Sequence, residues 1–174
     1  MKKILLIVIV AVLVTTTIFN GCLQNGTGTL VIQITDTPGD LNITRANVTI
    51  SQVQVHRGAE GGNNTTAGWF TVVNDSKTFD LITLIGVKEF FGRTNLSAGM
   101  YTQIRLVVES CVITVNGTEY NCKVPSGKIK LIKPFVLMAN QTITLTMDFD
   151  LQESITEKGN HQYTFQPVIK VIQE

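Results

Sequence analysis

The sequence is poor in the residues on which most catalytic and metal sites depend. Its 174 residues include only two histidines, three cysteines and one tryptophan. His56 and His161 have no ligand-like neighbours, so the sequence offers no zinc-binding cluster, and no serine lies in a G-x-S-x-G motif. The formal net charge is only +1, without the basic excess that binding of nucleic acid requires. We therefore expect neither an enzyme nor a partner of nucleic acid.

The first 22 residues carry the clearest information about location. Lys2 and Lys3 precede an apolar run, and a small residue stands directly before Cys22. This order is typical of an export signal. We predict that residues 1–21 are a signal peptide or membrane anchor and that Cys22 is a lipidation site. Two alternatives are ordinary secretion and an uncleaved anchor at residues 4–19, which is somewhat shorter than the roughly 20 residues that a membrane span needs.

All three alternatives place the rest of the chain outside the cytoplasm. We predict that residues 22–28 hold the lipidation site and a polar linker, and that residues 29–173 form one domain. Apolar residues make up 44% of the chain, which is enough for a folded core. The six residues after Cys22 reach at most about 20 Å. Lipid at Cys22 would therefore hold the domain against the extracellular face of the cell membrane.

The pattern of the domain is that of β-strands. Residues 142–150 alternate strictly between apolar and polar side chains, which predicts a strand with one buried face. Similar short stretches are separated by turn residues every 8–12 positions. The sequence predicts a single β-sandwich of about eight or nine short antiparallel strands, immunoglobulin-like or prealbumin-like. A break in the alternation at Ser51 and Gln52 predicts a β-bulge, and residues 84–91 are expected to form a helical turn or two.

The most specific local prediction is a hairpin between Cys111 and Cys122. The dipeptide Asn116-Gly117 favours a type I′ turn. Pairing around this turn places Cys111 directly opposite Cys122, at a separation that a disulfide can bridge. Because we expect the domain to be exported, we predict this disulfide.

Asparagine is concentrated in glycosylation sequons. Nine of the 12 asparagines stand in Asn-x-Ser/Thr, a pattern that favours an exported and glycosylated surface. A threonine-rich β-protein with asparagine in its turns would give the same pattern without glycans. The candidate positions are Asn25, Asn42, Asn47, Asn63, Asn64, Asn74, Asn95, Asn116 and Asn140.

Two sets of side chains are candidates for ligand binding. Asp148 and Asp150 lie on one face of a predicted strand, and Asp36 lies in a turn that could approach them, as could Asp40. Such a group suits calcium, which takes carboxylate oxygens, although the wet face of an amphipathic strand is the simpler explanation. We therefore expect no cofactor and keep calcium as a weak candidate. The second set is aromatic: Trp69, Tyr101, Tyr120 and Tyr163 could stack on sugars, but we expect Trp69 and some of the tyrosines in the core.

Several segments resemble one known family of exported lipoproteins. They are GTLVI at 28–32, TDTP at 35–38, FDL at 79–81, LSAGMYTQIRL at 96–106, VPSG at 124–127, DFD at 148–150 and PVI at 167–169. Together they resemble the domain of unknown function 4382 over about residues 28–172. The resemblance implies an immunoglobulin-like or prealbumin-like β-sandwich, and it implies no reaction and no catalytic residues.

These observations lead to one expected function and two alternatives. We expect a non-catalytic, membrane-tethered extracellular β-sandwich that acts as a cell-surface binding module or as a structural module of the envelope. The first alternative is a calcium-dependent or carbohydrate-binding surface module, and the second is an exported hydrolase. The expected partners are the membrane, through a lipid on Cys22 or an N-terminal helix, and a surface glycan or an envelope protein.

Overall fold

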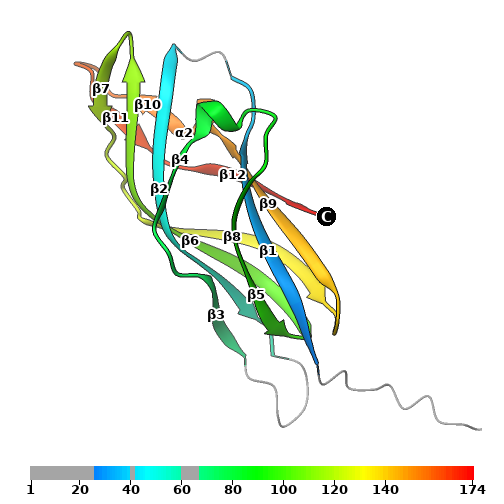
Figure 1. The fold of residues 1–174 in the computed structure, drawn as a ribbon. Coiled ribbons are helices and arrows are strands. Elements are labelled where there is room, and N and C mark those ends of the chain that lie inside the picture. The colour runs from blue at the N-terminus through cyan, green and yellow to red at the C-terminus, as the bar shows by residue number, and fades with distance from the viewer. Residues whose placement is uncertain (1–25, 40–41, 60–66) are drawn as a thin grey trace, which may run out of the picture.

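The protein is a sandwich of two β-sheets, seen in a computed structural model that describes residues 26–39, 42–59 and 67–174 (Figure 1). The first sheet has the strand order β12-β9-β1-β5. In the second sheet β2 and β6 lie in the centre; β3 and β4 pair with β2, and β7 and β8 pair with β6. A third, two-stranded sheet pairs β10 with β11. The predicted all-β sandwich is thus confirmed.

The element bounds are as follows. The first sheet contains β1 (Thr27–Asp36), β5 (Glu89–Ser97), β9 (Thr142–Asp150) and β12 (Val168–Gln173). The second contains β2 (Ile43–Arg57), β3 (Gly68–Val73), β4 (Lys77–Asp80), β6 (Gly99–Val115), β7 (Thr118–Asn121) and β8 (Lys128–Leu137). The smaller elements are η1 (Leu81–Leu84), α2 (Leu151–Ser154), β10 (Ile155–Glu157) and β11 (Tyr163–Phe165).

The core lies between the two sheets and follows the two-residue repeat of the strands. On β1, Leu30, Ile32 and Ile34 are fully buried, whereas Val31 and Gln33 between them are half-buried on the outer face. Strand β9 repeats this arrangement with Ile143, Leu145, Met147 and Phe149, as its sequence predicts. The second sheet supplies the opposing layer, chiefly Val48, Ile50, Val53, Val55, Ile104 and Leu106.

One pairing in the first sheet was not expected. Strands β1 and β9 run parallel, with Thr29 beside Thr142 and Asp36 beside Phe149. We expected only antiparallel strands, because hairpin turns dominate the sequence. A parallel pair has no connecting turn that would mark it in the sequence, since the two strands are joined by a crossover. Here all six strands of the second sheet lie between β1 and β9 in the chain.

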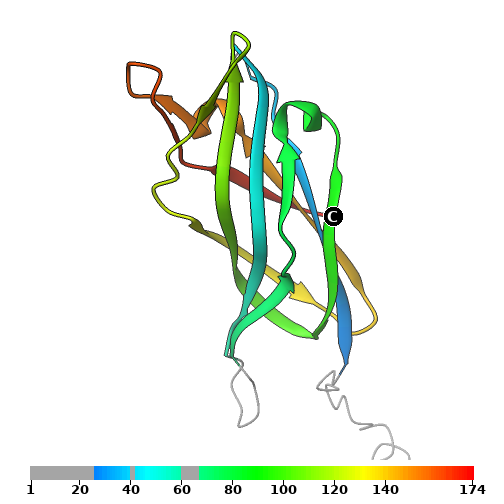
Figure 2. The same cartoon turned by 60° about the vertical axis from the view of Figure 1, so that its left-hand side comes forward.

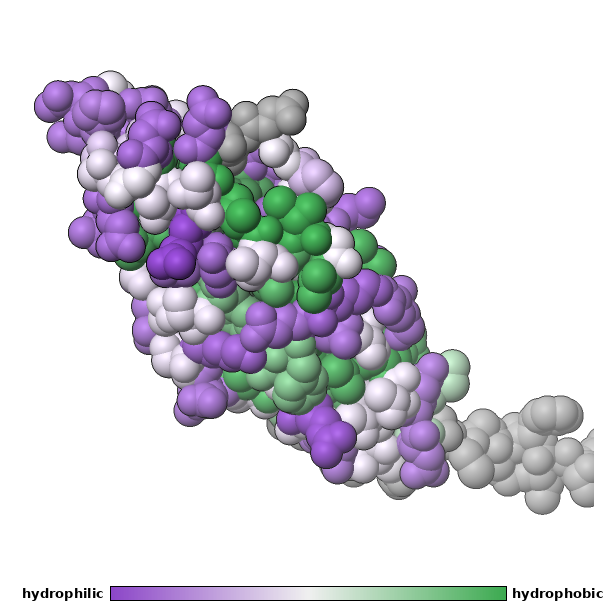
Figure 3. Space-filling model, turned by 45° about the horizontal axis from the view of Figure 1, so that its top comes forward, coloured by the Kyte–Doolittle hydropathy of each residue, from purple (hydrophilic) through white to green (hydrophobic). Residues whose placement is uncertain are grey.

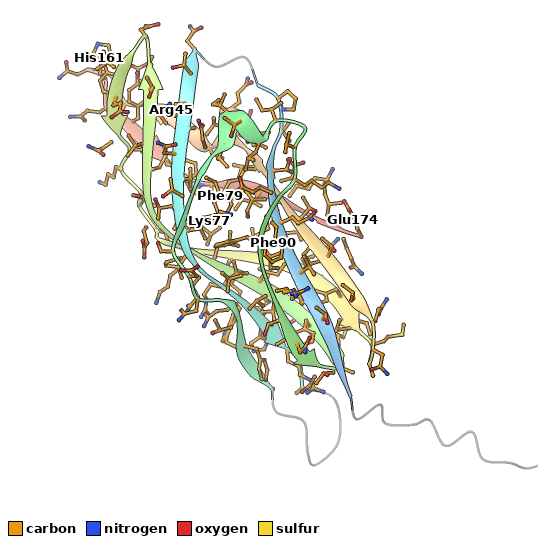
Figure 4. The ribbon with its side chains drawn as sticks, in the orientation of Figure 1. Arg45, Lys77, Phe79, Phe90, His161 and Glu174 are labelled. Carbon is orange, nitrogen blue, oxygen red and sulfur yellow. The ribbon has the colours of Figure 1, made fainter. Side chains whose placement is uncertain are left out.

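The edges of the two sheets are joined at β4 and β5. The Lys77 ammonium on β4 lies 2.8 Å from the Glu89 carboxylate on β5 and 5.1 Å from the centre of the Phe79 ring. Beneath this pair, the rings of Phe79 and Phe91 meet edge to face with centroids 5.0 Å apart. Figure 4 labels Lys77 and Phe79 along β4, which pairs with β2.

The prediction of a helical turn at residues 84–91 is wrong in its placement. A short 3-10 helix covers Leu81–Leu84, and residues from Glu89 onward form β5. Gly86 has a φ of 73°, a left-handed conformation that glycine adopts without strain and that ends the helical turn. Phe91 and Leu96 then bury their side chains against the core as part of β5.

Two local predictions are confirmed. The β2–β6 register shifts on both sides of Ile50, next to the predicted bulge at Ser51 and Gln52. The turn between β6 and β7 has φ values of 49° at Asn116 and 79° at Gly117, as a type I′ turn requires.

The leader predicted at residues 1–21 and the lipidation site Cys22 lie outside the described residues. Within the described residues no helix is long and apolar enough to cross a membrane.

Replacing Ile32 by alanine tests the inward alternation of β1. Ile32 has no exposed surface, so Ile32→Ala should lower the free energy of unfolding by about 2–5 kcal/mol. Val31→Ala is a matched control on the outer face of the same strand and should cost roughly 1 kcal/mol or less. Urea unfolding of both variants gives the comparison, and equal losses would contradict the assignment of faces.

Candidate functional site

The outer face of the second sheet carries two rows of mostly polar side chains. The strand register aligns them across β3, β2, β6 and β8, in that order. We call these eight residues the outer platform. The first row is Trp69, His56, Gln103 and Ile132, and the second is Thr71, Gln54, Arg105 and Lys130. Figure 2 shows the two central strands, β2 and β6, running side by side along the molecule.

Side-chain contacts connect the platform residues to each other. The guanidinium carbon of Arg105 lies 3.8 Å from the centre of the Trp69 ring, and the His56 ring meets Trp69 edge-on at 5.1 Å. Arg105 Nη1 donates to Gln54 Oε1 at 3.4 Å, and Gln54 Nε2 donates to Thr71 Oγ1 at 3.5 Å. These contacts hold the planar groups of Trp69, Arg105 and Gln54 in place before any ligand arrives.

The charge of the platform is positive. Arg105 and Lys130 are cations, and none of the eight residues is acidic. The platform therefore offers one aromatic ring, two amides and two cationic donors on a single sheet face. Aromatic rings stack on the apolar faces of planar or cyclic ligands, while amides and guanidinium groups bind hydroxyl and carboxylate oxygens.

Trp69 was expected in the core, and the structure corrects this. Its side chain is half-buried on the outer face, where Arg105 covers the ring. Of the tyrosines, Tyr101 and Tyr163 are buried and Tyr120 is half-buried. Tyr101 belongs to the core, where it stacks on Phe135 at 5.2 Å and its hydroxyl donates to the carbonyl of Ser97.

The carboxylates predicted to bind calcium gather at one end of the sandwich. Thr35 and Asp36 on β1 lie beside Asp148 and Phe149 on β9, and this end contains a cavity of about 170 Å³. Its lining includes Asp36, Thr37, Gly39, Ile43, Ile82, Ile85, Leu151 and Gln152.

Each of these carboxylates already accepts a hydrogen bond from the protein. Asp36 Oδ1 accepts from the backbone N–H of Leu151 at 3.2 Å, and Asp148 Oδ1 accepts from the Thr37 hydroxyl at 3.0 Å. Asp150 Oδ1 accepts from the N–H of Glu153 at 3.0 Å and caps α2. Across the described ranges, no three His, Cys, Asp or Glu side chains are grouped to hold a metal ion. Asp40 lies outside those ranges, and calcium binding stays a prediction.

Asp36 is the most perturbed carboxyl at this end. Only 3% of the residue is exposed, and burial raises the pKa of Asp36 to about 7. The nearby carboxylates of Asp148 and Asp150 act in the same direction, while the hydrogen bond from Leu151 opposes them. A buried acid that binds its proton near neutral pH makes the stability of the fold depend on pH.

The two cysteines of the hairpin lie where the sequence places them. Val112 pairs with Asn121, and the backbone N–H of Cys122 donates to the carbonyl of Cys111 at 2.9 Å. Both side chains are buried, and the structure records them as free thiols. Their mutual hydrogen bond raises the pKa of Cys111 and lowers the pKa of Cys122. The predicted disulfide therefore stays a prediction, although the predicted register is confirmed.

The sequons that the structure describes are accessible. Asn47 on β2 is half-buried, and the other described positions are exposed. Asn25, Asn63 and Asn64 lie outside the described residues. The exposed sequon asparagines are Asn42, Asn74, Asn95, Asn116 and Asn140.

The two histidines are far apart in the structure. His56 belongs to the outer platform, and His161 lies at one end of the molecule (Figure 4). There His161 stacks on Tyr120 with ring centroids 5.5 Å apart, and its Nδ1 lies 3.9 Å from a Glu157 oxygen.

The outer platform was missed in the sequence, although a signal for it exists. Residues 52–56 read Gln-Val-Gln-Val-His. The valines face the core, so Gln52, Gln54 and His56 share the outer face by alternation. Only the register with β3, β6 and β8 shows which side chains stand beside them.

Comparison with known proteins identifies one family. Residues 27–167 match the family model described as "Domain of unknown function (DUF4382)". No curated protein and no solved structure matches the chain.

Replacing Asp36 by asparagine tests the raised pKa of this carboxyl. Asp36 favours folding when protonated, so its contribution is complete below about pH 4 and is lost as the pH rises to about 7. Asp36→Asn keeps an acceptor for Leu151 but cannot ionise. It should match the wild type at pH 4 and be more stable at pH 8, by at most about 4 kcal/mol.

Urea unfolding at pH 4, 6 and 8 measures this difference. Asp36→Ala serves as the control, because it removes the acceptor and should destabilise the fold even at pH 4. The same pH dependence in Asp36→Asn and wild type would contradict the assignment to Asp36.

Proposed function

We propose that this chain, which belongs to the DUF4382 family, is a non-catalytic binding module tethered to the extracellular face of the cell membrane and that the outer platform contacts its ligand. The observation that carries this proposal is the alignment of eight outward side chains in two rows across four strands. The contacts among Trp69, Arg105 and Gln54 hold these three side chains in place without burying them in the core.

The evidence for the membrane tether comes from the sequence that precedes the domain. The basic and apolar leader ends at Cys22, which suits an export signal followed by a lipidated cysteine. The exposed sequons agree with a surface that faces the cell exterior. Lipid on Cys22 and glycans on the exposed sequons other than Asn140 are parts of the same proposal.

A carbohydrate is the ligand class that the platform favours. A sugar ring can lie on the Trp69–Arg105 pair, and its hydroxyl groups can bond to Gln54, Gln103 and His56. The absence of acidic side chains among the eight platform residues and the presence of Arg105 and Lys130 favour an acidic saccharide over a neutral one. A purely structural role in the envelope remains the alternative, and it requires no ligand for this face.

Binding to a glycan array that includes acidic polysaccharides tests this proposal. Trp69→Ala and Arg105→Ala should each weaken binding about 30-fold, because truncating a central aromatic or arginine typically costs about 2 kcal/mol. Phe90→Ala is the matched control: Phe90 is also an exposed aromatic, 51% accessible, but it lies on β5 of the first sheet.

The variants must keep the wild-type thermal unfolding profile for the comparison to count. Glycan binding that survives both platform substitutions would place the site elsewhere. No binding to any glycan, together with self-association in native envelopes, would favour the structural alternative.

We infer that the exported protein forms a disulfide between Cys111 and Cys122. The two residues are opposed on a tight hairpin, and both thiols are buried against each other. In the chain-entropy model, a bridge across so short a loop should add about 2–3 kcal/mol to the free energy of unfolding.

Peptide mapping after alkylation tests this bond in protein isolated from the cell surface. Neither cysteine should be alkylated before reduction, and both should be alkylated afterwards. Cys111→Ser provides the control, since it should leave Cys122 open to the reagent once the protein is unfolded. Two reactive thiols in the unreduced, unfolded wild type would reject the bond.

A further inference from the structure

The described chain begins at one pole of the sandwich, between two turns. The carbonyl of Gly26 accepts from the N–H of Ala98, and the carbonyl of Thr27 accepts from the N–H of Asn140. We call this end the N-terminal pole; it comprises residues 26–27, 97–100 and 136–141. In Figure 1 it is the lower end, where β1 begins beside the ends of β5 and β8.

The N-terminal pole exposes large apolar side chains. Met100 is 45% exposed, Val136 is 50% exposed and Met138 is 54% exposed. Met100 and Val136 are cross-strand neighbours on β6 and β8. The residues of the pole include no charged side chain. The cation of Arg57 borders the pole, where its Nη2 donates to the carbonyl of Ala98.

Exposed apolar side chains also occur elsewhere in the described chain. Ile85, Val87 and Phe90 are exposed, and Figure 3 shows hydrophobic residues gathered in the middle of the face turned to the viewer. The N-terminal pole differs from these sites in its position, because the chain continues from Gly26 directly toward Cys22.

The short distance along the chain between Gly26 and Cys22 limits where this pole can lie. The four residue steps from Cys22 to Gly26 span at most about 14 Å. If Cys22 carries a lipid, the pole must therefore stay within the headgroup region or just above it. Uncharged surface with flexible methionine side chains is the kind that enters the boundary between headgroups and acyl chains.

We propose that the N-terminal pole docks on the lipid bilayer and inserts Met100, Val136 and Met138 into its interface. This proposal rests on the proposed tether, which supplies the bilayer, and adds a second, reversible contact. Docking fixes the orientation of the domain. The Trp69–Ile132 row of the outer platform then lies next to the membrane, because Met100 and Val136 continue the same outer face toward the pole.

Photo-crosslinking of the full chain in lipid vesicles tests the docking. The protein is reconstituted in vesicles of phosphatidylcholine and phosphatidylglycerol with p-benzoylphenylalanine in place of Met138. The matched control carries it in place of Val168, which is 46% exposed and pairs with Asp150 at the other end of β9. We expect lipid adducts at position 138 that are several-fold more abundant than at position 168.

A second variant separates docking from the tether. Met138→Asp should sharply reduce the lipid adducts formed by p-benzoylphenylalanine at position 136, while flotation of the vesicle-bound chain and thermal unfolding stay unchanged. A chain that floats with the vesicles but gives equal adducts at positions 138 and 168 would overturn the docking alone. A chain that does not float would overturn both the docking and the proposed tether.

Two further outcomes would contradict the docking. Protein–protein adducts at position 138 in place of lipid adducts would assign the pole to a second copy. A glycan on Asn140 in native protein would also contradict it, because Asn140 lies in the same turn and is exposed. A sugar chain there would hold Met138 away from the bilayer.

Discussion

The alternation of side chains along the strands is the constraint on which the rest of this structure depends. Each strand of the two main sheets has one face toward the shared core, so every second side chain is committed to packing. Ile32 and Leu145 on the first sheet and Val55 and Ile104 on the second are fully buried for this reason. The side chains at the intervening positions point away from the core. They form both the outer platform and the apolar surface of the N-terminal pole.

Much of the fold could be predicted from the sequence because its signals are local. The strict alternation of residues 142–150 gives β9, and Asn116-Gly117 gives the hairpin with Cys111 opposite Cys122. Strand β5 was missed, because Phe90, Phe91 and Gly92 carry no clear alternation and its pairing with β1 is long-range. The parallel pairing of β1 with β9 was missed for a similar reason, since no turn connects them.

The candidate site was less predictable than the fold. Asp36 does lie at the same end of the sandwich as Asp148 and Asp150, but one oxygen of each carboxylate already accepts a hydrogen bond, from Leu151, Thr37 and Glu153 in turn. Trp69 was expected in the core because large aromatic side chains commonly fill the space between two sheets. Its outward position follows from the register with His56 and Arg105, which depends on bulges in β2 that shift the phase of the strand. Sequence spacing gives proximity along one strand, whereas a binding face needs the order of several strands.

The parallel pairing of β1 with β9 also determines when the domain can form during synthesis. The first strand of the chain pairs on one side with residues 142–149, so the central pair of the first sheet is incomplete until nearly the whole domain has been synthesised. Contacts of such long sequence separation form slowly. The hairpins of the second sheet have shorter separations and can close earlier. Until β9 arrives, the apolar face of β2 and β6 lacks much of its cover, and the incomplete domain is prone to aggregation at this stage.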